Sequence, residues 1–189
     1  MPRVSVDHLQ ARRQQILDGS RAAFARHGYE GATVRILEQE IGLSRGAIFH
    51  HYADKDALFL ALATQDADTI VHIVTEHGLV QVMREMVGAP DPGRLGVQLE
   101  VARKVRTDAG FRAAWAPYSA RIHQATLDRL DRLDRQRTTG SLRADVDVEQ
   151  LAGYLELVWE GLIAHLAAGL PTDQLDGVLD VVEGAVRLR

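Results

Sequence analysis

The spacing of apolar residues constrains the fold of this chain more than any other feature of the sequence. Along almost the whole length it follows the period of an α-helix, so that Ile16, Ser20, Ala23, Phe24 and His27, for example, share one side of a helix. No run alternates apolar and polar residues for long enough to indicate a β-strand. The pattern therefore predicts an all-α fold of about nine helices.

Glycines and short polar residues mark where the predicted helices begin and end. Gly28 follows the first predicted helix, which spans roughly residues 8–27, and is the glycine expected just past a helix C-terminus. Thr33 is a predicted N-cap for a second helix that ends at Gly42, and Ser44 is a predicted N-cap for a third. These signals place three helices in the first 52 residues.

The rest of the chain is predicted to be helical as well. Asp54 is expected to cap a longer fourth helix that begins at Lys55 and extends into the seventies. Loops are predicted at GAPDPGR and TTGSLRADVD. Further helices are expected near residues 78–88, 93–107, 110–137, 147–168 and 173–188.

Length and composition exclude several classes of protein. At 189 residues the chain lies near the border between one large domain and two small ones. It has no cysteine, which excludes disulfides, thiolate zinc sites and a cysteine nucleophile. The first twenty residues lack the apolar core of a signal peptide, and by sequence no apolar stretch approaches the length needed to span a bilayer. We therefore expect a cytoplasmic protein with no membrane partner.

The charge of the chain is unevenly distributed. The net charge of −4 by itself argues against a nucleic-acid partner. Residues 1–55, however, carry eight basic and six acidic side chains, a local charge of +2, which leaves −6 for the remainder. A mildly basic N-terminal part on an acidic body suits contact with phosphates at one end only.

Residues 33–52 have the spacing of a helix-turn-helix. A helix of about nine residues, a tight turn at Gly42 and a helix of about eight residues form this arrangement. In the second helix, Ile48 and Tyr52 are expected to face the core, and Gly46 lies on the opposite side. A face that begins with glycine can approach a DNA major groove closely, and free amides near Ser44 favour phosphate.

The segment TVRILEQEIGLSRGAIFHHYADKDALF, residues 33–59, resembles the DNA-binding signature of the TetR family of bacterial repressors. The shared pattern is Gly-Leu-Ser, a glycine two residues later, Ile-Phe-x-His-Tyr and a lysine near the next helix start. The resemblance is strong over about the first 60 residues. It implies a helix-turn-helix DNA-binding domain over residues 1–53 and a helical ligand-binding and dimerisation domain over 54–189.

By position, the resemblance also implies a set of DNA contacts. Phe49 stands where the family commonly has tyrosine, so a phosphate hydrogen bond is lost there. Ala47 replaces a common threonine, which leaves contact with a thymine methyl group as its contribution. The implied phosphate contacts are Thr33, Arg35, Ser44, Tyr52 and Lys55, and the residues implied to lie against bases or sugars are Arg45, Gly46, Ala47, Phe49 and His50.

Each of these residues also has an interpretation without DNA. Adjacent residues on a helix point about 100° apart, so His50 and His51 are not expected to share a metal ion, and His51 is expected to be a buried, hydrogen-bonded histidine. Arg45 could be an ordinary solvated charge. Lys55 could simply balance the neighbouring acidic residues Asp54 and Asp56.

The predicted helix 147–168 has an apolar arc of about 180°, wider than one core-facing stripe needs. The resemblance implies that the last two helices form a four-helix dimer interface with their mates. Two recognition helices about one DNA turn apart, ~34 Å, would then bind a palindrome. The alternative is a fully buried central helix in a monomer.

Several segments resemble the aconitase-repressor subgroup of actinobacterial TetR regulators, among them VRTDAGFRAAW and VLDVVEGAVR. The subgroup implies repression of an aconitase gene and an effector, citrate with Mg²⁺, held by Arg132 and Glu183. Glu183 would repel citrate unless a hard cation lay between them, so it is the implied metal-binding residue. It could instead point outward, and Arg132 could pair with Asp128 on the helix surface.

Further candidates remain unranked. Glu100, Arg103 and Arg106 lie in the predicted sixth helix and could also bind the ligand. Asp68 and His72 have the helical spacing of metal ligands, but a surface pair is the simpler interpretation.

Three classes of function remain to be distinguished. The first is a dimeric repressor controlled by a small-molecule effector, with no required cofactor. The second, an enzyme, is not expected, because no nucleophile with a matched base, glycine-rich phosphate loop or metal cluster is visible. The third is a DNA-binding protein without an effector, or an activator, which a solid interior without a cavity would favour.

Overall fold

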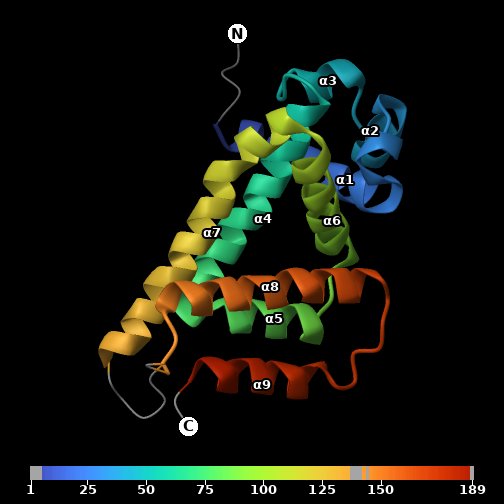
Figure 1. Ribbon diagram of the computed structural model, residues 1–189. Coiled ribbons are helices and arrows are strands. Elements are labelled where there is room, and N and C mark those ends of the chain that lie inside the picture. Colours follow the sequence, from blue (N-terminus) through green and yellow to red (C-terminus); the bar gives the residue numbers. More distant parts are fainter. Residues whose placement is uncertain (1–5, 137–141, 144, 188–189) are drawn as a thin grey trace. The chain divides into compact units, whose positions relative to one another are not determined.

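The computed structural model describes residues 6–136, 142–143 and 145–187, and these residues form nine helices and no extended strand. The predicted all-α fold is thereby confirmed. Part of the predicted loop at 138–147 and residue 188 of the last predicted helix lie outside the described residues. The helices are α1 (Val6–Gly31), α2 (Val34–Ile41), α3 (Arg45–Phe49), α4 (Lys55–His77), α5 (Leu79–Gly88), α6 (Pro92–Thr107), α7 (Ala109–Gln136), α8 (Val148–Ala167) and α9 (Leu175–Val186), as labelled in Figure 1.

The predicted caps of the short helices are confirmed. The Thr33 side chain accepts a hydrogen bond from the Ile36 amide, and the Ser44 side chain accepts one from the Ala47 amide, both at 3.4 Å. Gly42 ends α2 with a φ of 73°, in the left-handed region. The third helix is shorter than predicted, because α3 ends at Phe49 and the residues after it form a turn.

The described residues group into two compact units. The first comprises Met1–Gln65 and Pro92–Trp115, and the second comprises Asp66–Asp91 and Ala116–Arg189.

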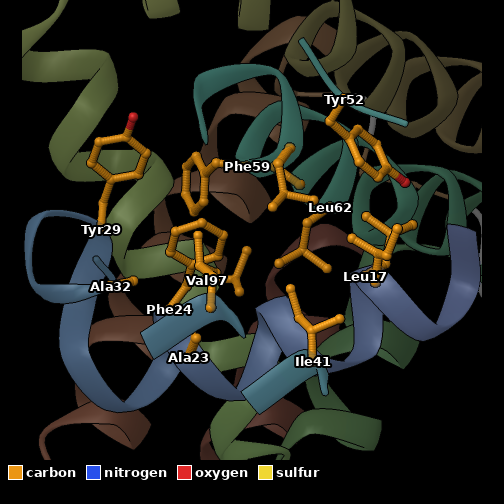
Figure 2. Packing of buried hydrophobic residues seen from close by; sticks show 14 of the residues in the cluster. Leu17, Ala23, Phe24, Tyr29, Ala32, Ile41, Tyr52, Phe59, Leu62 and Val97 are labelled. Carbon is orange, nitrogen blue, oxygen red and sulfur yellow. The ribbon is translucent and has the colours of Figure 1, made fainter. Parts of the chain in front are cut away.

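The core of the first unit contains a group of aromatic rings that pack together (Figure 2). Phe24 and Tyr29 lie edge-on to Phe59, with ring centroids 5.0 and 5.3 Å apart. Ile48 and Tyr52 are buried as predicted, so α3 is anchored in this core. His27 is exposed and directly precedes Gly28, where α1 is interrupted (φ 65°).

Two glycines allow α1 to approach its neighbours closely. A Cβ atom on Gly19 would lie 2.7 Å from the Cα atom of Ile41 in α2. A Cβ atom on Gly96 in α6 would lie 2.7 Å from the Cα atom of Ala25. Helices α2 and α6 are therefore both packed against the backbone of α1, which fixes the position of the helix-turn-helix within the first unit.

A buried lysine joins three segments of the first unit. The ammonium of Lys104, whose side chain is 6% exposed, lies 2.7 Å from Asp56 and 3.2 Å from Asp108. It also lies 3.8 Å from the centre of the Tyr29 ring, and the Tyr29 hydroxyl donates to Asp56 at 2.7 Å. Burial lowers the pKa of Lys104, but the two carboxylates outweigh this and leave the pKa raised.

In the second unit, α5 packs against both α8 and α9 (Figure 1). The faces of α8 and α9 that meet other residues of this unit bury Leu155, Leu162, Leu179 and Val182, among others. The same helices leave large apolar side chains exposed, Leu157 at 70%, Val178 at 47% and Val181 at 71%, and Leu170 in the segment between them is 49% exposed.

Helix α4 meets the length and composition of a membrane span, which the sequence had not suggested. Its most apolar 18-residue window has a mean hydropathy of 1.3, and 44% of that window is buried inside the protein. Leu58, Phe59 and Leu62 of this helix are completely buried. Apolar core helices pass the same test, and α4 contributes core residues of this kind.

Candidate DNA-binding surface and ligand pocket

The exposed side of α3 is formed by residues that the sequence assigned to DNA. Arg45, Gly46 and His50 are exposed, and no atom lies within 4 Å of the position that a Cβ atom on Gly46 would take. Ile48, on the opposite side, is completely buried. The helix and its C-cap residue thus present the polar side chains of Arg45 and His50, and the backbone at Gly46 can be approached closely by another molecule.

The N-terminus of α3 differs from the prediction of free amides. The Glu38 carboxylate accepts a hydrogen bond from the Arg45 amide at 2.6 Å, and Ser44 caps the Ala47 amide. A carboxylate therefore occupies the place where a phosphate was expected, because both are anions that favour a helix N-terminus. Glu38 was not predicted as a cap of α3, although it lies only seven residues before Arg45, in the preceding helix.

Of the five residues assigned to phosphate contacts, three are exposed and two are partly or fully buried. Thr33, Arg35 and Ser44 are exposed. Lys55 is half-buried, donates to the Tyr29 carbonyl at 2.9 Å, and lies 4.2 Å from the centre of the Tyr29 ring. Tyr52 is 5% exposed and buries its ring in the core.

Two further observations bear on the alternatives for these residues. Asp54 caps the Ala57 amide and Asp56 accepts from Tyr29 and Lys104, so both carboxylates have partners other than Lys55. Phe49 is half-buried and packs against the core cluster, and Ala47 is half-buried too. The aromatic side chain therefore supports the helix as well as bordering its outer face.

The rings of the adjacent residues His50 and His51 are close together but steeply inclined to each other. Their ring centroids are 5.5 Å apart and the rings are inclined at 80°. His51 is half-buried rather than buried as predicted; loss of solvent lowers its pKa, and the nearby His50, Arg13 and Arg12 lower it further. Over the ranges that the structure describes, no three His, Asp or Glu side chains form a group that could hold a metal ion.

A cavity of about 70 Å³ lies in the second unit. Most of its wall is apolar, and its polar side chains come from the end of α4, from α7 and from the end of α9. The residues lining it are His77, Gly78, Leu79, Val80, Thr126, Arg129, Leu130, Leu133, Leu142, Leu155, Glu183, Val186 and Arg187.

Glu183 lines this cavity and is already paired with two guanidinium groups. Arg187 lies 2.6 Å from one of its oxygens and Arg84 lies 3.1 Å from the other. Arg84 also contacts Asp180 at 2.7 Å, and hydrogen bonds to Asp180 and Glu183 raise the pKa of Arg84. The Glu183 side chain is 35% exposed, so it is neither buried nor directed fully into solvent.

Arg132 is a sequence neighbour of residues that line the cavity, but it is not itself part of the cavity wall. It is exposed, and its guanidinium donates to the Thr75 carbonyl at 2.7 Å and to the Asp128 carbonyl at 3.2 Å. The alternative of an Arg132–Asp128 contact is thus present, although it involves the backbone oxygen of Asp128. The structure does not pair Arg132 with Glu183.

The remaining candidates lie elsewhere. Glu100, Arg103 and Arg106 belong to α6 in the first unit, where Arg103 contacts Glu100 at 2.9 Å and Glu30 at 3.3 Å. The backbone carbonyl of Arg106 accepts a hydrogen bond from the Arg112 side chain at 3.1 Å.

Asp68 and His72 of α4, which have the helical spacing of metal ligands, also lie outside the cavity wall. Asp68 pairs with Arg121 at 2.8 Å, and His72 is exposed. Both side chains are exposed.

Comparison with known proteins identifies the class of the chain. Residues 16–62 match the model described as bacterial regulatory proteins, tetR family. The chain is 52% identical over 188 residues to the HTH-type transcriptional repressor Rv1474c of Mycobacterium tuberculosis, with 99% of each chain covered. It is 50% identical over 190 residues to the HTH-type transcriptional repressor AcnR of Corynebacterium diphtheriae, covering 99% of this chain and 97% of the relative.

Solved structures show the same fold at low sequence identity. A putative transcriptional regulator from Saccharomonospora viridis in complex with choline has a TM-score of 0.75 at 20% identity, covering 94% of this chain and 98% of that one. GusR of Salmonella enterica has a TM-score of 0.73 at 18% identity, covering 98% and 99%. The close relatives are named as transcriptional repressors, which confirms the expectation of a regulator rather than an enzyme.

Proposed function

This chain belongs to the TetR family of bacterial transcriptional repressors. We propose that it binds a palindromic operator as a homodimer, and that a small molecule either lowers or raises its affinity for this operator. The observation that carries the proposal is the exposed face of α3, with Arg45, Gly46 and His50 outward and Ile48 buried beneath. A repressor of this kind works where the bacterial chromosome is, and the proposed location is therefore the cytoplasm.

The proposed DNA contacts follow from exposure. Arg45 and His50 can reach base edges, with Gly46 permitting close approach and Ala47 offering a methyl contact. Phe49 would touch a sugar only with its outer edge, since it also packs on the core.

The phosphate contacts are proposed for exposed side chains first. Thr33, Arg35 and Ser44 are free of the core and can hold phosphates directly. Lys55 can reach DNA only by giving up its contacts with Tyr29, and Tyr52 can offer only its hydroxyl group.

The homodimer is proposed from the exposed apolar side chains of α8 and α9. Leu157 and Val181 are each about seven-tenths exposed, and a face of this kind is covered in a stable oligomer. A four-helix interface made by both helices and their mates would cover them. In this proposal residues 1–53 bind DNA and residues 54–189 bind ligand and partner.

The proposed effector is citrate with Mg²⁺, and the proposed target is an aconitase gene, on the basis of the AcnR relatives. Glu183 lines the cavity and is the carboxylate suited to a hard cation. Mg²⁺ commonly takes one or two protein carboxylates and completes its shell with ligand oxygens and water, so a single glutamate fits. Arg132, from the same helix as four cavity residues, would approach from the rim.

Three features of the cavity favour a second candidate, a different small ligand. Its wall is mainly apolar, and Arg84 and Arg187 already neutralise Glu183. Its volume of about 70 Å³ is also below the ~300–1,000 Å³ usual for ligand pockets, so a bound citrate would have to widen it. The presence of a cavity nevertheless favours a regulator with an effector over a DNA-binding protein without one.

The proposal is tested by binding to DNA from the promoter region of the organism's aconitase gene. Wild-type protein is expected to bind one palindromic site as a dimer, with citrate and Mg²⁺ changing the affinity. Calorimetric titration of the wild type, Arg132→Ala and Glu183→Ala with citrate, with and without Mg²⁺, identifies the effector site. Binding to the operator without any response to citrate would retain the repressor and reject this effector.

A further inference from the structure

The second turn of α1 carries two adjacent arginines that the proposed DNA contacts do not use. Both Arg12 and Arg13 are exposed. Among the described residues neither guanidinium is paired with a carboxylate: Arg12 donates to the side-chain carbonyl of Gln15 at 2.9 Å, and Arg13 lies over an aromatic ring. Arg26, later in the same helix, is instead paired with Glu40 at 2.5 Å. The charges of Arg12 and Arg13 are therefore available to an external anion.

These arginines lie beside the end of the helix-turn-helix. The guanidinium carbon of Arg13 is 5.5 Å from the centre of the ring of Tyr52, which is buried three residues after the end of α3. Burial lowers the pKa of His51, and nearby cations, Arg13 and Arg12 among them, lower it further. The exposed face of α3 ends at His50, its C-cap residue. Arg12 and Arg13 therefore add positive charge next to the end of that face.

The turn that carries the arginines is fixed to two other helices of the first unit. The side-chain carbonyl of Gln14 accepts a hydrogen bond from Gln65 of α4 at 2.8 Å. The Gln15 side chain donates to the backbone carbonyl of Ile41, the last residue of α2, at 3.2 Å. Since Gln15 also accepts from Arg12, this arginine is connected to the end of α2. A side chain held in place before binding loses less conformational entropy when it binds.

The chemistry of this surface suits the phosphate groups of a DNA backbone. A guanidinium remains charged at physiological pH, and its planar donors match the oxygens of a phosphate. The edges of a DNA groove are formed by phosphates and sugars, and base edges are exposed only inside the groove. Side chains beside the end of a helix that lies in the groove therefore meet the backbone.

We propose that Arg12 and Arg13 bind backbone phosphates beside the DNA half-site contacted by α3. This inference rests on the proposed operator binding and extends the DNA-contacting surface from the helix-turn-helix to α1. Phosphate contacts do not distinguish one base from another, so the two arginines add affinity for DNA of any sequence.

The test is fluorescence anisotropy of the full-length protein with two duplexes. One duplex comes from the promoter region of the organism's aconitase gene, and the other has the same length and a scrambled sequence. The variants are Arg12→Gln, Arg13→Gln and the double substitution. The matched control is Arg135→Gln, which removes the same charge from α7 in the second unit, where this side chain is 77% exposed. We expect each α1 substitution to weaken binding of both duplexes by about tenfold, and the control to bind like the wild type.

The salt dependence of binding provides a second readout. Each phosphate contact contributes about 0.9 to the slope of the logarithm of affinity against the logarithm of salt concentration. One substitution removes one contact from each protomer, so the slope for a bound dimer should fall by about 1.8. Arg13→Lys should retain part of this slope, because it keeps the charge without the planar donors.

Thermal unfolding separates a phosphate contact from support of the Tyr52 ring. A lower melting temperature of Arg13→Gln, together with an unchanged salt slope, would overturn the inference. So would α1 variants that bind both duplexes as Arg135→Gln does, in which case the operator proposal would stand. A loss confined to the promoter duplex would overturn it too, since it would indicate contact with bases. Failure of the wild type to bind either duplex would reject the proposed DNA binding itself.

Discussion

The buried Lys104 predicts an asymmetric response to mutation. Asp56→Asn removes its nearest counter-ion, at 2.7 Å, and leaves Asp108 at 3.2 Å as the remaining carboxylate. Breaking a fully buried pair typically costs ~3–5 kcal/mol. The Asp56 side chain is 61% exposed and Asp108 remains, so we expect a loss of about 2 kcal/mol in the free energy of unfolding.

Replacing the lysine instead of the aspartate should lower the free energy of unfolding by less. Lys104→Met keeps the hydrocarbon stem against Tyr29 and removes the buried charge, while the exposed Asp56 can still accept from the Tyr29 hydroxyl. Replacing a buried ion by an apolar group of similar shape is often close to neutral, within ~1 kcal/mol.

Urea denaturation followed by circular dichroism measures both variants and the double mutant. We expect Asp56→Asn to lower the free energy of unfolding more than Lys104→Met does. In the Lys104→Met background, Asp56→Asn should then have little further effect, because no buried ammonium remains to be neutralised. Equal losses from the two single substitutions, with additive effects in the double mutant, would refute the reasoning that the buried ammonium dominates this cluster.

Further predictions concern the same unit. Gly96→Ala should lower the free energy of unfolding by ~1–3 kcal/mol, measured by thermal unfolding, because the new Cβ atom would lie 2.7 Å from the Ala25 Cα atom. Gly46→Ala should leave the melting temperature unchanged, because no atom lies within 4 Å of its new Cβ atom. Arg45→Ala should reduce operator affinity by ~1–3 kcal/mol in fluorescence anisotropy while the elution volume of the dimer is unchanged, and retained affinity would remove Arg45 from the DNA surface. Hydrogen bonds from Lys104 and Tyr29 lower the pKa of Asp56, so its contribution to stability is present above its ordinary pKa of ~4 and is lost as pH falls below it. Asp56→Asn should flatten that acid limb in denaturation curves, and an unchanged slope would contradict this.

One contact at the start of α3 concerns both the stability of this helix and its proposed DNA binding. The Glu38 carboxylate at the Arg45 amide completes the turn between α2 and α3, yet it lies on the side where a phosphate was expected. The protein therefore stabilises the start of α3 in the free state with an anion of its own.

Short-range features of this protein were determined by the sequence alone. Thr33, Gly42 and Ser44 mark helix ends because each cap acts on atoms a few residues away. Ile48 and Tyr52 were assigned to the core from the helical period, which depends only on neighbouring positions. The helix-turn-helix is local in the same sense, and its signature lies within one continuous segment.

Contacts between distant segments were decided only by the tertiary structure. Tyr29, Asp56 and Lys104 come from three helices, and nothing in their local sequence shows that the lysine is buried among them. Arg129 and Arg132 occupy equivalent places in the repeated motif LDRLDRLDRQR, yet one lines a cavity and the other binds backbone carbonyls. Periodicity sets the direction of a side chain on its own helix, but which residues of other segments it meets depends on packing over the whole unit.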